Sequence, residues 1–208
     1  MAEIAASHTP DHLPKVLAGL VVLLFLVPYY HTHHHAKPAP GPLVREEPEI
    51  TPLDGKTVWQ VKGYSMTALA SCRLHARVLH TERYYFDRES DLSPVDLAVG
   101  WRGMSDSRYL DQMDITQGGR WYFFEYKEPP LPNEVISAES KNIHILPATR
   151  EIASQVKSVQ THQVVRLSGS LVKVTGPDGY IWTSSLSTGG SGDGSCWVFW
   201  VDRMDVEN

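Results

Sequence analysis

The sequence predicts a mainly β (α+β) protein, in which a single N-terminal transmembrane helix precedes a compact, barrel-like, β-rich domain with one or two helices. Three observations predict this class. An uncharged apolar run spans residues 16 to 30, and a proline-rich segment follows it. The rest of the chain alternates short apolar or aromatic runs with Gly, Pro and Asp clusters, as strands and turns do. With 208 residues, 42% hydrophobic and 21% charged, the chain has the composition of a folded protein.

The first 30 residues are predicted to form a cytoplasmic tail and a membrane anchor. Thr9 suits a helix cap and Pro10 suits the first helical position. The 21 residues from Pro10 to Tyr30 would form about 30 Å of helix, enough to cross a bilayer. A cleaved export signal and a buried core helix are the alternatives. The segment lacks a basic start and a small-residue cleavage site, so we expect a retained single-pass signal-anchor.

Residues 31–55 are predicted to be a His/Pro-rich linker. Five prolines between residues 36 and 52 favour an extended spacer. Four imidazoles could bind a transition metal, but nothing in the sequence fixes their geometry, so we expect an interfacial polar collar and keep metal binding as the alternative. These four residues are His31, His33, His34 and His35. Lysine and arginine counts do not decide the membrane orientation, and the order of anchor, spacer and domain favours a periplasmic or extracellular domain.

Residues 56–208 are predicted to form the β-rich domain. Residues 64–78 alternate apolar and polar side chains, although a helical stripe also fits part of this segment. The alternation favours a strand. A bend is expected at Gly169, which suits a strongly curved barrel of the OB or SH3 type. The expected strands are 56–61, 64–78, 119–126, 143–146, 162–174, 180–186 and 196–201, with a helix over 149–159 and loops at 83–107, 128–134 and 185–195.

The composition excludes some function classes. The net charge is −5 and no extended basic run exists, so a nucleic-acid partner is not expected. The Gly/Ser-rich loop at 185–195 lacks the lysine of a phosphate-binding loop and has too few acidic residues for calcium. No cofactor is predicted.

Anchor, spacer and small domain together suggest an accessory or scaffold protein that presents a protein-binding domain beside the membrane. Its expected partners are other membrane or envelope proteins, and the bilayer itself through the N-terminal helix. Trp101, Arg102 and Asp106 form the candidate binding surface, because Trp and Arg are common in interfaces. A loop packed against its own core is the alternative for these residues.

The alternative function is a membrane-tethered hydrolase. His144 lies on a predicted strand with Asn142 on the same face, and Cys196 begins the last strand. A Cys-His-Asn hydrolase uses these residue types, with a serine as another candidate nucleophile.

A disulfide is also predicted between Cys72 and Cys196. Both cysteines occupy the apolar side of an expected strand, and an exported domain would keep the bond oxidised. Two independent buried thiols are the alternative.

Overall fold

A computed structural model describes residues 41–190, 192 and 194–207. The predicted tail, the anchor helix and His31, His33, His34 and His35 lie outside these residues. Within the described part of the chain, no helix has the length and apolar character needed to cross a bilayer.

The described residues are mainly β, as predicted, and the helices are short. The strands are β1 (Glu49–Pro52), β2 (Val58–Val61), β3 (Tyr64–Arg83), β4 (Val95–Gly100), β5 (Asp114–Gly118), β6 (Trp121–Glu125), β7 (Ser140–Pro147), β8 (Val164–Thr175), β9 (Ile181–Thr183) and β10 (Trp197–Glu207). The helices are α2 (Ser107–Leu110), α3 (Asn133–Ala138), α4 (Arg150–Ser158) and the 3-10 turns η1 (Arg88–Asp91) and η2 (Arg102–Ser105).

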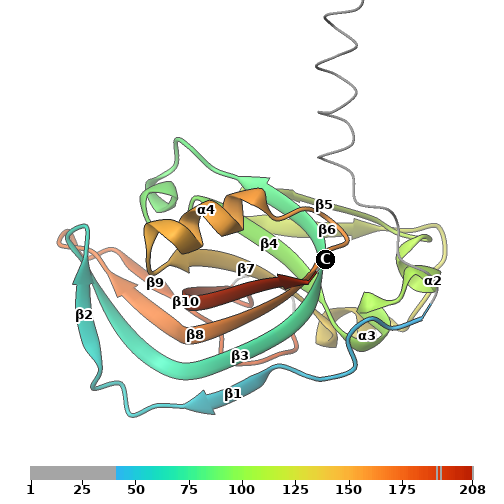
Figure 1. Cartoon of the computed structure of the whole chain (residues 1–208), viewed down its shortest axis with the longest axis horizontal. Helices are drawn as coiled ribbons and strands as arrows, with labels where there is room; N and C mark the ends of the chain where they lie inside the picture. Colours follow the sequence, from blue (N-terminus) through green and yellow to red (C-terminus); the bar gives the residue numbers. More distant parts are fainter. Residues whose placement is uncertain (1–40, 191, 193, 208) are drawn as a thin grey trace, which may run out of the picture. The chain divides into compact units, whose positions relative to one another are not determined.

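Five strands pair in a closed ring, the arrangement of a barrel. β3 pairs with β4, β4 with β7, β7 with β10, β10 with β8, and β8 with β3. Only the contact between β7 and β10 is parallel among these pairs. In Figure 1 the long curved strands β3 and β8 lie side by side, and α4 packs against β7 and β10. The β5–β6 hairpin forms a separate two-stranded sheet.

The alternation in residues 64–78 produces the strand that the sequence predicts. Every second side chain of β3 from Met66 to Val78 is buried; Ala70 and Leu74 pack in the main core, and Met66 packs in a second apolar cluster beyond the register shift between Ala68 and Ala70. The strand extends to Arg83, because its second half pairs with β4. Burial of one complete face explains why the period-two pattern prevails over the helix propensity of this segment.

The expected bend at Gly169 is present. The backbone of Gly169 has φ +154°, and a Cβ atom there would lie 1.9 Å from the carbonyl oxygen of Trp200. The pairing of β8 with β10 shifts register close by, between Val201 and Arg203. Glycine therefore allows the two strands to approach closely beside the register shift.

Two segments differ from the prediction. The end of the expected linker belongs to the domain, because β1 pairs with β3 and Val44 is fully buried in the core. The expected loop at 83–107 contains β4, a central strand whose six residues are all buried. Both of its faces are covered, so it carries no apolar–polar alternation to reveal it.

The structure contradicts the predicted disulfide, because Cys72 and Cys196 are both free thiols. Cys72 is paired with Gly169 on β8, and Gly169 is paired with Val201 on β10. Cys196 lies five residues before Val201, about 16 Å away along the strand direction. A disulfide needs Cα atoms within about 7 Å.

Candidate functional site

A cluster of polar side chains lies on the outer face of β4, β7 and the start of β10. Along β4 and β7, alternate residues such as Leu97 and Ile143 point into the apolar core. The residues between them point outward, yet Asp96, Asn142 and His144 are at most 3% exposed. The β5–β6 hairpin and Trp182 of β9 contact these residues and shield them from solvent. A buried polar cluster of this kind requires mutual hydrogen bonds.

Asp96 and His144 form the centre of the cluster. They are direct partners in the antiparallel pairing of β4 with β7. Nδ1 of His144 lies 2.8 Å from Oδ2 of Asp96, and the two side chains are 4% and 0% exposed. The carboxylate therefore fixes the orientation of the imidazole and leaves Nε2 for another partner.

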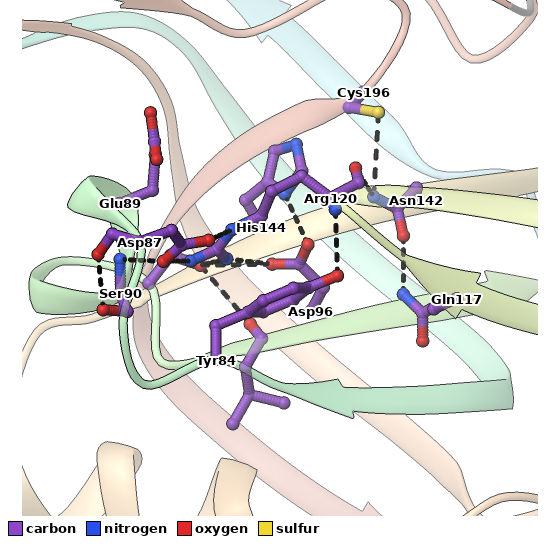
Figure 2. A network of polar contacts seen from close by, with 12 residues as sticks. Tyr84, Asp87, Glu89, Ser90, Asp96, Gln117, Arg120, Asn142, His144 and Cys196 are labelled. Carbon is purple, nitrogen blue, oxygen red and sulfur yellow. Dashed lines mark hydrogen bonds and ion pairs between the residues drawn. The ribbon is translucent and has the colours of Figure 1, made fainter.

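Arg120 neutralises the carboxylates on the hairpin side of the cluster. This residue lies in the β5–β6 turn with φ +71°, and one of its guanidinium nitrogens donates to Asp96 Oδ1 at 2.8 Å. The other nitrogens donate to both oxygens of Asp87, at 2.7 and 2.8 Å. The guanidinium stacks over the ring of Tyr84 at 3.8 Å. Figure 2 shows Arg120 between the two aspartates.

The neighbours of His144 determine the pKa of its imidazole. Burial alone lowers the pKa of His144, but the hydrogen bonds from Asp96 and Cys196 and their charges outweigh it, and the pKa rises to about 9. The Arg120 hydrogen bonds hold the pKa of Asp87 below its usual value. At neutral pH His144 is therefore an imidazolium, paired with Asp96 on one side.

Cys196 lies beside the imidazole and is partly exposed. The residue that follows it, Trp197, is paired with Ile143, so Cys196 lies level with Asn142. The side-chain nitrogen of Asn142 lies 3.7 Å from the cysteine sulfur, as Figure 2 shows. Asn142 is held in place by the carbonyl oxygen of Arg120 at 2.9 Å and by Gln117 at 2.6 Å.

Three further side chains surround the thiol. The ring of Trp182 packs against His144 with a centroid distance of 4.9 Å. Burial raises the pKa of Tyr122, whose hydroxyl contacts Ser140, and the charge of Cys196 adds to this effect. Burial lowers the pKa of Lys141 to about 8, against the opposing charge of Cys196. The partly exposed thiol therefore has the side chains of His144 and Lys141 as its cationic neighbours.

The structure brings together the three residues of the alternative function, Asn142, His144 and Cys196, and adds Asp96 and Arg120. Sequence reasoning missed Asp96 because it placed residues 83–107 in a loop, and it missed Arg120 because only the folded chain brings Arg120 to Asp96. A charged residue between Val95 and Leu97 in an apolar run is the signal that could have identified a buried functional carboxylate. Across residues 41–190, 192 and 194–207, no three His, Cys, Asp or Glu side chains are grouped as metal ligands.

The predicted binding surface at Trp101, Arg102 and Asp106 is only partly on the surface. Trp101 is fully buried and stacks on Trp197 with ring centroids 6.3 Å apart. Asp106 is 1% exposed and accepts hydrogen bonds from Arg108 and from the backbone nitrogen of Gly41. Arg102 is half-exposed. Trp101 and Asp106 therefore stabilise the loop from inside, and of the three only Arg102 exposes its side chain to solvent.

Comparison with known proteins found no matching family model, no significantly similar curated protein and no significantly similar solved structure, so the geometry of the cluster carries the functional argument.

Proposed function

We propose that this protein is a cysteine-dependent hydrolase or acyltransferase, tethered to a membrane by its N-terminal apolar segment. The observation that carries this proposal is the series of contacts from Cys196 through His144 to Asp96. Nucleophile, imidazole and orienting carboxylate in this order are the parts of a catalytic triad. Cys196 is the nucleophile, His144 the acid–base group and Asp96 the residue that orients the imidazole.

The reaction follows from the proton positions. His144 carries protons on both ring nitrogens, so the reactive form pairs a Cys196 thiolate, whose proton has left to solvent, with the imidazolium that the Asp96 carboxylate stabilises. The thiolate attacks the acyl carbon of an ester, thioester or amide, and the carbonyl electrons move to oxygen. When the tetrahedral intermediate collapses, Nε2–H protonates the leaving group and a thioester remains on Cys196. Water or another nucleophile, deprotonated by the now neutral imidazole, then attacks the thioester, releases the acyl group and regenerates the thiolate–imidazolium pair.

Asn142 and Arg120 are positioning residues in this scheme. The Asn142 side chain contacts the sulfur and is itself fixed by Gln117 and by the Arg120 backbone. Arg120 donates a hydrogen bond to Oδ1 of Asp96, and Oδ2 remains directed at His144. Because all of these groups come from strands or from one tight hairpin, the site is preorganised before substrate binds.

The direct test is acylation of the full-length chain by p-nitrophenyl acetate. We expect one acetyl group per chain, attached at Cys196, together with a burst of nitrophenolate. His144→Gln should slow acylation by about 100-fold or more, the usual contribution of an acid–base group. Cys72→Ala is the matched control and should leave the rate unchanged, because burial raises the pKa of the Cys72 thiol to about 12. Acetylation that is equally fast in the His144 variant would refute the proposal.

A second candidate function is membrane-tethered recognition of a protein, for which one observation is specific. Tyr85 and Phe86, in the loop after β3, are 67% and 99% exposed and contact each other. Large exposed aromatic side chains are common in binding surfaces. Phe86→Ser should then remove proteins that co-purify in mild detergent while leaving Cys196 acylation intact. Unchanged co-purification would exclude this loop as the recognition surface.

The membrane tether and the exported location remain proposals that rest on the N-terminal sequence. We expect the chain to stay with the membrane after a carbonate wash and to keep its original N-terminus. A mature protein that begins after the proline-rich segment would show instead that the apolar run is a cleaved export signal.

A further inference from the structure

A cavity at the start of the domain is lined by three arginines. Its volume is about 280 Å³, and it lies between the chain entering the domain and the η2–α2 segment. Its lining residues are Pro42, Arg45, Arg102, Gly103, Asp106, Arg108 and Tyr109. The arginines are separated by up to 63 positions in sequence, since Arg45 and Arg108 both contribute, so only the folded domain brings them together.

The charges around this cavity do not balance. Arg108 donates to the buried carboxylate of Asp106, which also receives two backbone N–H groups and so has little capacity for more. Arg102 pairs with the exposed carboxylate of Glu47 at 2.6 Å. Among the residues that the structure describes, no carboxylate forms an ion pair with the Arg45 guanidinium. Three guanidinium groups therefore share two carboxylates.

The backbone holds one of these arginines in a strained conformation. Arg102 has φ +49°, in the left-handed region that a residue other than glycine rarely adopts. Its N–H donates to the carbonyl oxygen of Val44 at 2.7 Å, and its carbonyl accepts the Ser105 hydroxyl at 2.8 Å. These bonds tie the entering chain to η2 and fix the direction of the Arg102 side chain. Strain of this kind is typical of functional positions.

We propose that this cavity binds a phosphate group, with Arg45 and Arg102 as its principal ligands and Arg108 at its edge. Guanidinium groups match the tetrahedral oxygens of phosphate through paired N–H donors, and three of them supply more donors than the neighbouring carboxylates use. The volume suits a small phosphate ester or a lipid headgroup and is at the lower limit for a drug-sized ligand. The cavity is independent of the Cys196 site, so the two proposals can fail separately.

The test uses the full-length chain in non-ionic detergent and two probes that carry the same headgroup. Glycerol 1-phosphate represents a soluble ligand, and dihexanoylphosphatidylglycerol represents a lipid. Binding is measured by calorimetry for the wild type, for Arg45→Gln and for Arg45→Lys. Arg45 is the residue to change because it supports no carboxylate in the fold. The matched control is Arg166→Gln, which removes an exposed arginine paired with Glu207.

We expect saturable binding of at least one probe, weakened about 10-fold in Arg45→Gln and less in Arg45→Lys, with no change in Arg166→Gln. Tighter binding of the lipid would identify a membrane headgroup as the ligand, and equal or tighter binding of glycerol 1-phosphate would identify a soluble ester. Absence of binding to both probes, or equal affinity in the wild type and Arg45→Gln, would overturn the proposal. Melting temperatures of the four proteins exclude misfolding as the cause of a loss.

Discussion

The raised pKa of His144 makes the stability of the domain depend on pH in a direction that can be calculated. In the folded domain this pKa is about 9, against 6.5 in an unfolded chain. The folded state therefore binds the proton more tightly, and protonation favours folding. The stabilisation is complete below about pH 6.5 and is lost as the pH rises toward 9. A difference of about 2.5 between the two pKa values corresponds to about 3 kcal/mol.

Lys141 limits the useful range of the measurement. Its pKa is lowered to about 8 in the fold, so deprotonation of Lys141 stabilises the domain as the pH rises from 8 to 10.5. Between pH 5.5 and 8 His144 acts with little interference from Lys141. Over this interval the His144 contribution should fall by about 2 kcal/mol.

The assay is urea unfolding at pH 5.5 and pH 8, followed by tryptophan fluorescence, in the wild type and in His144→Gln. The two proteins share every other ionisable group, so the difference between the two pH dependences isolates His144. We expect the wild type to lose about 2 kcal/mol more than the variant. In Cys196→Ala most of the effect should remain, because the Asp96 hydrogen bond raises the pKa of His144 more than the Cys196 hydrogen bond does. Equal pH dependence in the wild type and His144→Gln would refute the imidazolium–carboxylate pair.

Two further predictions concern buried residues. Arg120→Met should lower the free energy of unfolding by about 3 kcal/mol in urea titrations, because it leaves the fully buried carboxylate of Asp96 without one of its two cations. A decrease below about 1 kcal/mol would mean that His144 alone neutralises Asp96. Trp101→Ala should lower the free energy of unfolding by about 3 to 5 kcal/mol in the same titration, because it removes a fully buried ring from the core. If the free energy of unfolding stayed the same while a binding partner was lost, Trp101 would be a binding residue.

Much of the fold follows from the sequence because most strands leave a local pattern. The alternation along residues 64–78 predicts β3, the i, i+4 spacing of Ile152 and Val156 predicts α4, and Gly169 predicts the irregularity between β8 and β10. These features are determined by residues that are close in sequence, so they can be predicted from one sequence.

The remaining elements depend on contacts that are distant in sequence. β1 is a strand within a proline-rich segment, where composition favours a spacer, because the edge of β3 is available to pair with it. β4 is buried on both faces, so its polar residue Asp96 resembles a turn signal. The site shows the same division: His144 and Asn142 share a face by local alternation, whereas Asp96 reaches His144 only through the pairing of β4 with β7.

The parallel pairing of β7 with β10 places Cys196 beside Asn142 only when the last strand of the chain joins the sheet. Asn142 and Cys196 are 54 residues apart, and β10 reaches β7 only after α4, β8 and β9 have been made. Contacts with such a large sequence separation carry a high loop-closure entropy and form slowly. A nascent chain that lacks β10 has the imidazole and its carboxylate but no nucleophile beside them. The rate at which Cys196 is alkylated during refolding, measured by stopped-flow labelling, therefore reports when the barrel closes.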